Sequence, residues 1–401
     1  MYKYTHFIKE NIAPVEAKYI KSSSSKANVA KFGLGELSSG LTESERLYRF
    51  EALSDIHISD DPTNYKSSYS DFENALEYAK AANCVFICIS GDLTDTAAGD
   101  IGKLRLEKYN QIREDIKLDD GSTFKIYEIA GNHENNSVGG DVNLAKYIGK
   151  PLYYTVTSIP DADDPSHNYV DANIPSTDVF IMVGHYGGYV GDGIGWRSSE
   201  FISTAELTWI HKTLDKFRDK RCFVFNHAFP NYSYVEGESV GDPKGLYNGA
   251  LWNPHDSHIG TAFVKLLVYY ENVILFHGHS HTRLHLQDVT KIANYSDKYG
   301  YKSVHIPSTA VPRDIGLNEK GEETLTVIQG ASEGYIVDVY PTCIVLNGVD
   351  FGMLDMSTYK REPSAQLGIA TYKIDTPIRD DIPSAFLKDI IGETVYKNIY
   401  G

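Results

Sequence analysis

Five short polar clusters in this chain contain the residue types that bind metal ions and act on phosphate esters. Carboxylate, amide and imidazole groups without thiolate suit Mn, Fe, Zn or Co, rather than an iron–sulfur cluster or Cu(I). Two such ions held side by side can clamp a phosphate ester and acidify a water molecule, so the clusters favour a metal-dependent hydrolase. The clusters are Asp55-Ile56-His57, Gly91-Asp92, Gly131-Asn132-His133-Glu134, Asn226-His227 and Gly278-His279-Ser280-His281.

The spacing within the clusters indicates which side chains can share an ion. Asp55 and His57 are two residues apart at the end of a predicted strand, so both point the same way. His279 and His281 have the same spacing. Asp92 follows a strand of its own, and its two carboxylate oxygens can bridge two cations. With one amide and one further imidazole, the ligand candidates are Asp55, His57, Asp92, Asn132, His227, His279 and His281.

Apolar runs that predict strands come directly before four of the five clusters, so loops at the strand ends can bring the polar residues together. Predicted helices alternate with these strands, and two of them open with capping boxes, Ser70 with Glu73 and Ser203 with Glu206. The alternation favours an α/β fold with largely parallel strands covered on both faces. The predicted strands are 49–54, 85–90, 124–130, 179–183, 222–225 and 273–276.

The two ends of the chain differ from this central region. After His281 the sequence is richer in strand-forming residues, and Glu333-Gly334 and Asn347-Gly348 have turn chemistry. We predict a small N-terminal β appendage at 1–47, a catalytic domain at 48–358 and a C-terminal surface extension at 359–401.

Composition limits the classes of partner. The net charge of -16, without a basic stripe, argues against a protein whose main function is to bind nucleic acid. Small phosphorylated molecules remain as candidate substrates. No apolar run is long enough to span a membrane, and the N-terminus lacks the core of a signal peptide. We therefore expect a cytoplasmic protein without a membrane partner, and we expect its four cysteines to be buried and reduced.

The order D-x-H, G-D, G-N-H-[DE], H, G-H-x-H resembles that of calcineurin-like metallophosphoesterases, over about residues 48–283. The resemblance implies a four-layer α/β/β/α sandwich with two mixed sheets and a dinuclear metal site at the strand ends. Gly91-Asp92-Leu93-Thr94-Asp95 and Glu134 look most like the cyclic-nucleotide phosphodiesterase and purple-acid-phosphatase-like branches. By this resemblance, one ion is bound by Asp55, His57, Asp92 and His281, and the other by Asp92, Asn132, His227 and His279.

The resemblance also implies a mechanism for a small phosphomonoester or phosphodiester. A hydroxide that bridges the two ions would attack phosphorus in line. His133, next to Asn132, would then protonate the departing alkoxide as general acid. Glu134 would orient His133 or raise its pKa.

Two questions about residues stay open. His185 also follows an apolar strand and competes with His227 as a ligand; we prefer His227, which follows the strand after the helix that begins at Ser203, as in family members. The loops 186–199 and 231–258 are rich in aromatic residues, which would contact the substrate or pack on themselves, and Arg197 is a candidate phosphate clamp.

Two alternative functions also stay open. One is a scaffold of the same fold with a catalytically silent site, which binds a protein partner. The other is a nuclease of the same superfamily. The metal pair, the natural substrate and the oligomeric state are left open by the sequence.

Overall fold

A computed structural model of the chain describes residues 41–61, 63, 65, 67–135, 140–184, 202–227, 262–263, 265–267, 269–284, 302–317, 320–321, 323–328, 330–352, 354–355, 360–361, 371–376 and 382–401. Most of the predicted N-terminal appendage, both aromatic loops, His185 and Arg197 lie outside these residues. The predictions made for them are therefore not addressed by the fold.

The first sheet has six strands in the order β16-β13-β12-β1-β2-β3. β1, β2 and β3 are parallel, and the other neighbours are antiparallel. The strands are β1 (Tyr48–Leu53), β2 (Ile87–Ile89), β3 (Ile126–Glu128), β12 (Glu333–Val339), β13 (Cys343–Asp350) and β16 (Thr371–Asp375). β16 falls within the segment predicted as a C-terminal extension, and it forms an edge of this sheet.

The second sheet also has six strands, in the order β5-β4-β6-β7-β8-β9. β6 to β9 are parallel, and β4 is antiparallel to β6 and parallel to β5. The strands are β4 (Tyr153–Thr157), β5 (Asn168–Val170), β6 (Asp178–Val183), β7 (Arg221–Asn226), β8 (Val273–His277) and β9 (Lys302–His305).

The two sheets pack face to face around a core that is rich in aromatic rings. Alternate residues of strands such as β1, β6 and β12 point into this core, as the two-residue period of a strand requires. The Phe50 ring meets the Phe180 ring edge to face at 5.2 Å, and Phe180 stacks on Phe223 at 4.7 Å, an arrangement that the charge distribution of aromatic rings favours. This core joins the two sheets into one unit.

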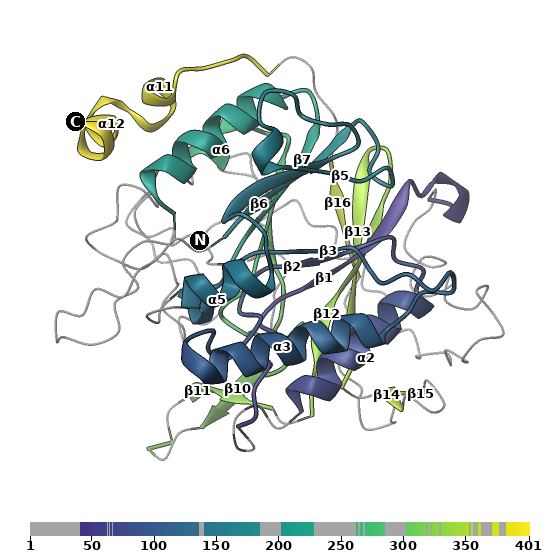
Figure 1. Ribbon diagram of the computed structural model, residues 1–401. Helices are drawn as coiled ribbons and strands as arrows, with labels where there is room; N and C mark the ends of the chain where they lie inside the picture. Colours follow the sequence, from purple (N-terminus) through teal and green to yellow (C-terminus); the bar gives the residue numbers. More distant parts are fainter. Residues whose placement is uncertain are drawn as a thin grey trace.

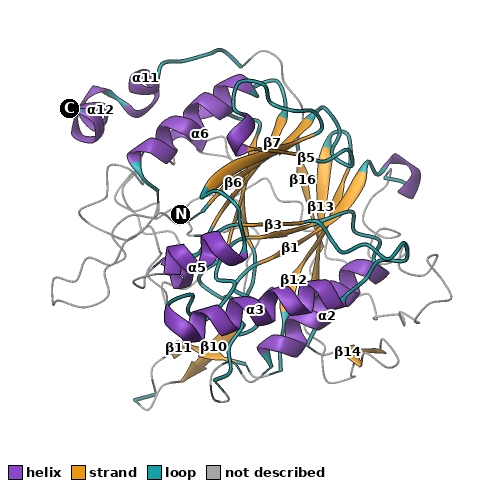
Figure 2. Ribbon diagram, viewed as in Figure 1, coloured by secondary structure: helices purple, strands orange, loops and turns teal. Residues whose placement is uncertain are grey.

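Helices cover the outer face of each sheet (Figures 1 and 2). α2 (Ser68–Ala81) and α3 (Gly99–Asp115) pack on the first sheet through residues such as Phe72 and Tyr109. α6 (Thr204–Lys216) and residues of 262–270 pack on the second sheet. The layers are therefore helix, sheet, sheet, helix, which confirms the predicted four-layer α/β/β/α sandwich with two mixed sheets.

Shorter elements complete the described residues. α11 (Leu387–Ile391) and α12 (Glu393–Tyr400) follow at the C-terminus, and the Tyr400 hydroxyl of α12 is 2.9 Å from Thr208 Oγ1 of α6 (Figure 1). Of the helices described, none is long and apolar enough to cross a membrane. All four cysteines are buried and outside disulfides, as predicted. The elements are η1 (Glu43–Glu45), α4 (Asn132–Asn135), α5 (Gly140–Tyr147), η2 (Pro165–His167), β10 (Arg313–Leu317), β11 (Glu323–Val327), β14 (Leu354–Asp355), β15 (Lys360–Arg361), α11 (Leu387–Ile391) and α12 (Glu393–Tyr400).

Local predictions from the sequence had mixed outcomes. The capping box of Ser203 and Glu206 is present at the start of α6. The one predicted for Ser70 and Glu73 is wrong, because α2 already begins at Ser68, after the N-cap residue Ser67. The turns predicted at 333–334 and 347–348 are also wrong, since both dipeptides lie within paired strands, β12 and β13.

Candidate metal centre

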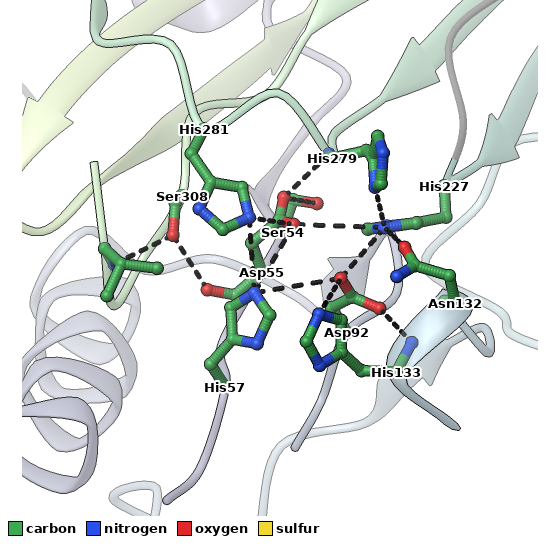
Figure 3. A network of polar contacts seen from close by, with 12 residues as sticks. Ser54, Asp55, His57, Asp92, Asn132, His133, His227, His279, His281 and Ser308 are labelled. Carbon is green, nitrogen blue, oxygen red and sulfur yellow. Dashed lines mark hydrogen bonds and ion pairs between the residues drawn. The ribbon is translucent and has the colours of Figure 1, made fainter. Parts of the chain in front are cut away.

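Six of the seven predicted ligands lie in loops that follow β1, β2, β7 and β8, and Asn132 is the first residue of α4, shortly after β3 (Figure 3). Within each sheet these strands are parallel, so their carboxyl ends lie at one edge, and the packed sheets bring the two edges together. The loops after β1 and β2 run side by side: Asp55 N donates to Gly91 O at 3.0 Å, and His57 N donates to Asp92 O at 2.9 Å.

Glycine is required where the loop after β8 crosses the loop after β1. A Cβ placed on Gly278 would overlap Ser54 Oγ and Asp55 Oδ2. Gly278 N also donates to His227 O at 3.0 Å. The close approach that this glycine permits places His279 and His281, from the second sheet, against Asp55, from the first.

The backbone of the site adopts a conformation that residues other than glycine rarely adopt. Six non-glycine residues among those described have a positive φ, and five of them are predicted ligands. Such a conformation costs about 1–3 kcal/mol per residue when the surroundings impose it, and it concentrates at functional sites. The five are Asp55 (φ 53), His57 (φ 46), Asp92 (φ 51), His279 (φ 72) and His281 (φ 59); the sixth is Asn83 (φ 57).

One group of candidate ligand atoms comprises Asp55, His57, Asp92 and His281, with all four atoms within 4.8 Å of one another. His281 Nε2 is 2.9 Å from Asp55 Oδ1. His57 Nε2 is 3.7 Å from Asp55 Oδ1, 3.7 Å from Asp92 Oδ2 and 3.2 Å from His281 Nε2. All four side chains are buried, so water competes little for these atoms.

A second group comprises Asp92, His227 and His279, and Asn132 adjoins it. His227 Nε2 is 3.1 Å from Asp92 Oδ2, 3.0 Å from Asn132 Oδ1 and 3.2 Å from His279 Nδ1. His227 Nδ1 is 2.6 Å from Ser90 O. A carbonyl oxygen can only accept, so Nδ1 carries a proton, and Nε2 is the nitrogen that faces the other ligand atoms.

The two aspartates show that a cation fits between these groups. Ser54 Oγ and His279 N both donate to Asp55 Oδ2, and His133 N donates to Asp92 Oδ1. The other oxygens, Asp55 Oδ1 and Asp92 Oδ2, are buried, and imidazole nitrogens approach them: His281 Nε2 at 2.9 Å and His227 Nε2 at 3.1 Å. Two buried carboxylates that share these oxygens with ring nitrogens provide the mixed N/O donor set of a metal site.

The family assignment comes from the sequence. The family model described as calcineurin-like phosphoesterase matches residues 48–283, more than half of the 401-residue chain. This chain belongs to the calcineurin-like phosphoesterase family. No curated protein matches it in sequence.

Among solved structures, the chain is similar to a dimetal phosphatase from Danio rerio, at 11% identity, with 83% of this chain and 100% of that chain covered and a TM-score of 0.46. It is also similar to a conserved uncharacterized protein from Streptococcus pneumoniae, a predicted phosphoesterase, at 11% identity, with 82% and 97% covered and a TM-score of 0.28. Both TM-scores are below 0.5, so the assignment of this phosphoesterase family member rests on the family match.

The electrostatics of the phosphoesterase site divide its histidines. Burial alone lowers the pKa of His227, but the carboxylates of Asp92 and Asp55 raise it to about 9. Burial lowers the pKa of His57 and His279, and it lowers the pKa of His281 to about 4 although Asp55 opposes this. Three of the four imidazoles therefore have the neutral form that metal binding requires, and an ion that binds His227 would displace the proton on its Nε2.

His133 lies at the edge of the metal centre, with its side chain 32% exposed. Its Nδ1 is 2.6 Å from Asp95 O, which accepts from it, and its Nε2 is 3.9 Å from Asp92 Oδ2. Its ring meets the His57 ring edge to face at 4.6 Å. Atoms of His57, Asp95 and His133 form a third group of candidate ligands, but the Asp95 carbonyl already occupies Nδ1 of His133.

Glu134 does not orient the His133 ring, contrary to one of the two roles predicted for it. Its carboxylate instead accepts from Thr94 N at 3.0 Å and from Gly131 N at 2.8 Å, so it ties the loop after β2 to the loop after β3. Its charge contributes to raising the pKa of His133, where burial acts in the opposite direction and Asp92 is the largest raising influence. The group that orients the ring is the Asp95 carbonyl, which no side-chain pattern in the sequence signals.

The structure thus brings all seven predicted ligands and His133 into one cluster, drawn from both sheets (Figure 3). His227, preferred over His185, lies in this cluster, whereas His185 lies outside the described residues.

Proposed function

We propose that this chain hydrolyses a small phosphomonoester or phosphodiester with two metal ions, which would be Mn, Fe or Zn. The supporting observation is the convergence of two buried carboxylate oxygens, Asp55 Oδ1 and Asp92 Oδ2, with four imidazoles in a member of this family. Asp55, His57, Asp92 and His281 would hold one ion. Asp92, Asn132, His227 and His279 would hold the other.

Two bound ions would supply positive charge for the phosphate oxygens and lower the pKa of a water molecule to near 7. The chain supplies the remaining parts of the reaction. Burial of Asp55, His57 and His227 excludes bulk water, which strengthens every electrostatic interaction there. The strained loops fix the ligand atoms before substrate arrives, so little reorganisation is needed during the reaction.

We further propose that His133 is the general acid for the leaving oxygen. Its Nδ1–H donates to Asp95 O, which fixes the ring and leaves Nε2 on the side of Asp92 Oδ2. The partial exposure of His133 allows a leaving group to reach this nitrogen and then depart. Since His133 is not among the residues that would hold either ion, its removal is expected to spare the metal ions.

The test combines elemental analysis with a panel of aryl and alkyl phosphomonoesters and phosphodiesters, with Mn, Fe or Zn restored. We expect about two metal ions per chain and hydrolysis of at least one ester. His133→Ala should keep the metal content and lose a factor of about 10² to 10⁴ in rate, most severely with alkyl leaving groups. An unchanged rate on an alkyl ester would remove His133 as the acid.

His167→Ala provides a matched control, because His167 has a similarly exposed side chain, at 30%, and is bonded to Asp164 away from the centre. Its rate should equal that of the wild type. The same panel separates the alternatives: a protein that keeps its metals but hydrolyses no ester supports the scaffold, and degradation of DNA or RNA supports the nuclease.

A further inference from the structure

The segment 305–313 lies beyond the residues matched by the family model, yet it runs along two of the loops that form the metal centre. It follows β9, the strand next to β8, and ends where β10 begins. Residues 304–312 are buried throughout. None of these residues belongs to the predicted ligand set.

One half of the segment is bonded to the loop after β1. Ser308 Oγ donates to Asp55 O at 3.0 Å, and Ala310 N donates to the same oxygen at 3.2 Å. Thr309 N donates to Ser54 O at 2.9 Å. Figure 3 shows Ser308 beside Asp55 and His281. The Asp55 carbonyl is thereby held by two donors at a residue whose φ is positive.

The ends of the segment are bonded to the loop after β8. His305 Nε2 is 2.6 Å from the hydroxyl of Ser280, the residue between His279 and His281. Arg313 N donates to His281 O at 2.7 Å. These bonds hold both sides of a tripeptide in which the two histidines have a positive φ.

Ser308 is itself held in one orientation. While its Oγ donates to Asp55 O, it accepts from Val311 N at 2.9 Å, and the side chain is fully buried. Its backbone oxygen accepts from Glu333 N, at the start of β12. Ser308 therefore connects the Asp55 loop to the frame of the first sheet through bonds with defined direction.

We propose that 305–313 is a positioning segment for the metal centre. In this segment Ser308 fixes the position of Asp55, and His305 fixes the positions of His279 and His281 through its bond to Ser280. This inference rests on the proposed function. Residues outside the ligand set that orient ligands commonly change metal affinity by about 10- to 100-fold when removed. Because Asp55 belongs to only one of the two ion sites, loss of the Ser308 hydroxyl should weaken one ion and leave the other.

The first experiment is a titration of the metal-free full chain with Mn²⁺, in competition with a chromophoric chelator. Ser308→Ala should show one of two binding steps weakened by about tenfold or more, and Ser308→Thr, which keeps the hydroxyl, should recover it. Thr157→Ala is the matched control. The buried Thr157 hydroxyl also donates to a backbone carbonyl, that of Ile159, and accepts from a side-chain N–H, that of Asn168.

A second measurement distinguishes positioning from simple loss of stability. The Tm of each variant is measured without and with saturating Mn²⁺, and the metal-dependent rise in Tm is compared. A purely structural role lowers both temperatures equally and leaves the rise unchanged. Positioning reduces the rise in Ser308→Ala and leaves it unchanged in Thr157→Ala.

His305 provides an independent pair of variants. His305→Ala should weaken both binding steps, since His279 and His281 serve different ions, and His305→Gln should restore much of the affinity through a new bond to Ser280. Wild-type affinity in both Ser308→Ala and His305→Ala overturns this inference and leaves the proposed function standing. Failure of the wild type to bind Mn²⁺, Fe or Zn overturns both.

Discussion

The two ends of the same strands differ in how their buried charged side chains are bonded. At the amino ends of β6 and β7, Arg221 and Asp178 form a buried pair with bonds of 2.6 and 3.1 Å. The Tyr48 hydroxyl donates to Asp178 Oδ2, and Arg221 also donates to Tyr340 O and Thr376 Oγ1. Every polar atom of these two charged side chains has a partner, and no residue named here has a positive φ.

At the carboxyl end of β7, about 20 Å away at roughly 3.3 Å per residue, the arrangement is different. Asp55 and Asp92 each turn one oxygen toward the imidazoles of the metal centre, and both residues have a positive φ. The amino end thus pairs its buried charges on an unstrained backbone. The carboxyl end holds carboxylates and imidazoles on a strained backbone, as expected where function sets the geometry.

The largest effect is expected at the amino end. Arg221→Met leaves the Asp178 carboxylate buried without its cation, which typically costs about 3–5 kcal/mol in unfolding free energy. Urea unfolding followed by tryptophan fluorescence measures this loss, with and without Mn²⁺. The loss should be equal in both conditions, because the pair is remote from the metal centre; a loss that appears only with metal would break the comparison.

Asp92→Asn should give a different pattern at the carboxyl end. The metal-free protein should lose some stability, because Asp92 Oδ2 lies 3.1 Å from His227 Nε2 and the surrounding histidines, against the effect of burial, lower the pKa of Asp92 well below its ordinary value. The added stability from metal, about 2.7 kcal/mol at a hundredfold excess over Kd, should be lost together with hydrolysis. Unfolding midpoints across a Mn²⁺ series measure this, and a variant stabilised by Mn²⁺ as strongly as the wild type would contradict it.

An effect of intermediate size is expected at Glu51, in the middle of β1. Its carboxyl is fully buried and accepts no hydrogen bond from the described residues, and burial raises its pKa well above the ordinary value. Glu51→Met should therefore raise the unfolding free energy by about 1–3 kcal/mol.

The sign of the pH dependence at Glu51 follows from the raised pKa. Above pH of about 4.3 the unfolded chain releases this proton and the folded chain keeps it, so the wild type loses up to about 1.4 kcal/mol per pH unit as pH rises toward the folded pKa. The advantage of Glu51→Met should grow between pH 5 and 8. Glu51→Gln, which cannot ionise, should remove the slope while it keeps a buried polar group.

The smallest effect is expected at the surface. Lys103 and Glu107 form an exposed pair one turn apart on α3, at 3.9 Å. Lys103→Ala should change the unfolding free energy by less than about 0.5 kcal/mol, with or without Mn²⁺. A larger loss in this variant would show that burial is not what makes the pair of Arg221 and Asp178 important for stability.

The clustering of the candidate ligands follows from the sequence because the polar clusters come after strands. Parallel strands place their carboxyl ends at one edge, so Asp55, Asp92 and His227 come together once the strands are located. The contribution of Asp95 to orienting His133 was not predictable, since it acts through a backbone carbonyl that every residue has. The positive φ values are equally hidden, because none of these five aspartate and histidine positions is a glycine, the residue that usually signals such a conformation.

Local signals failed where long-range packing outweighs propensity. Asn347-Gly348 favours a turn, but both residues lie in β13 and pair with β12. Asn347 Nδ2 also donates to the Asp338 carboxylate at 3.0 Å. At the start of α2, Ser67 Oγ donates to the Asp71 carboxylate at 2.6 Å, and the helix begins before Ser70. Pairing partners of this kind become visible only when distant segments are placed together.

The position of β1 in the first sheet has a consequence for synthesis. β1 pairs with β2 on one side and with β12 on the other, where Phe50 lies opposite Val337. At about 5–20 residues per second, a ribosome needs roughly 15 to 60 s to make the residues between them. Throughout that time one edge of β1 has no partner strand, which is an opportunity for incorrect pairing. We expect the nascent chain to depend on chaperones until β12 leaves the exit tunnel.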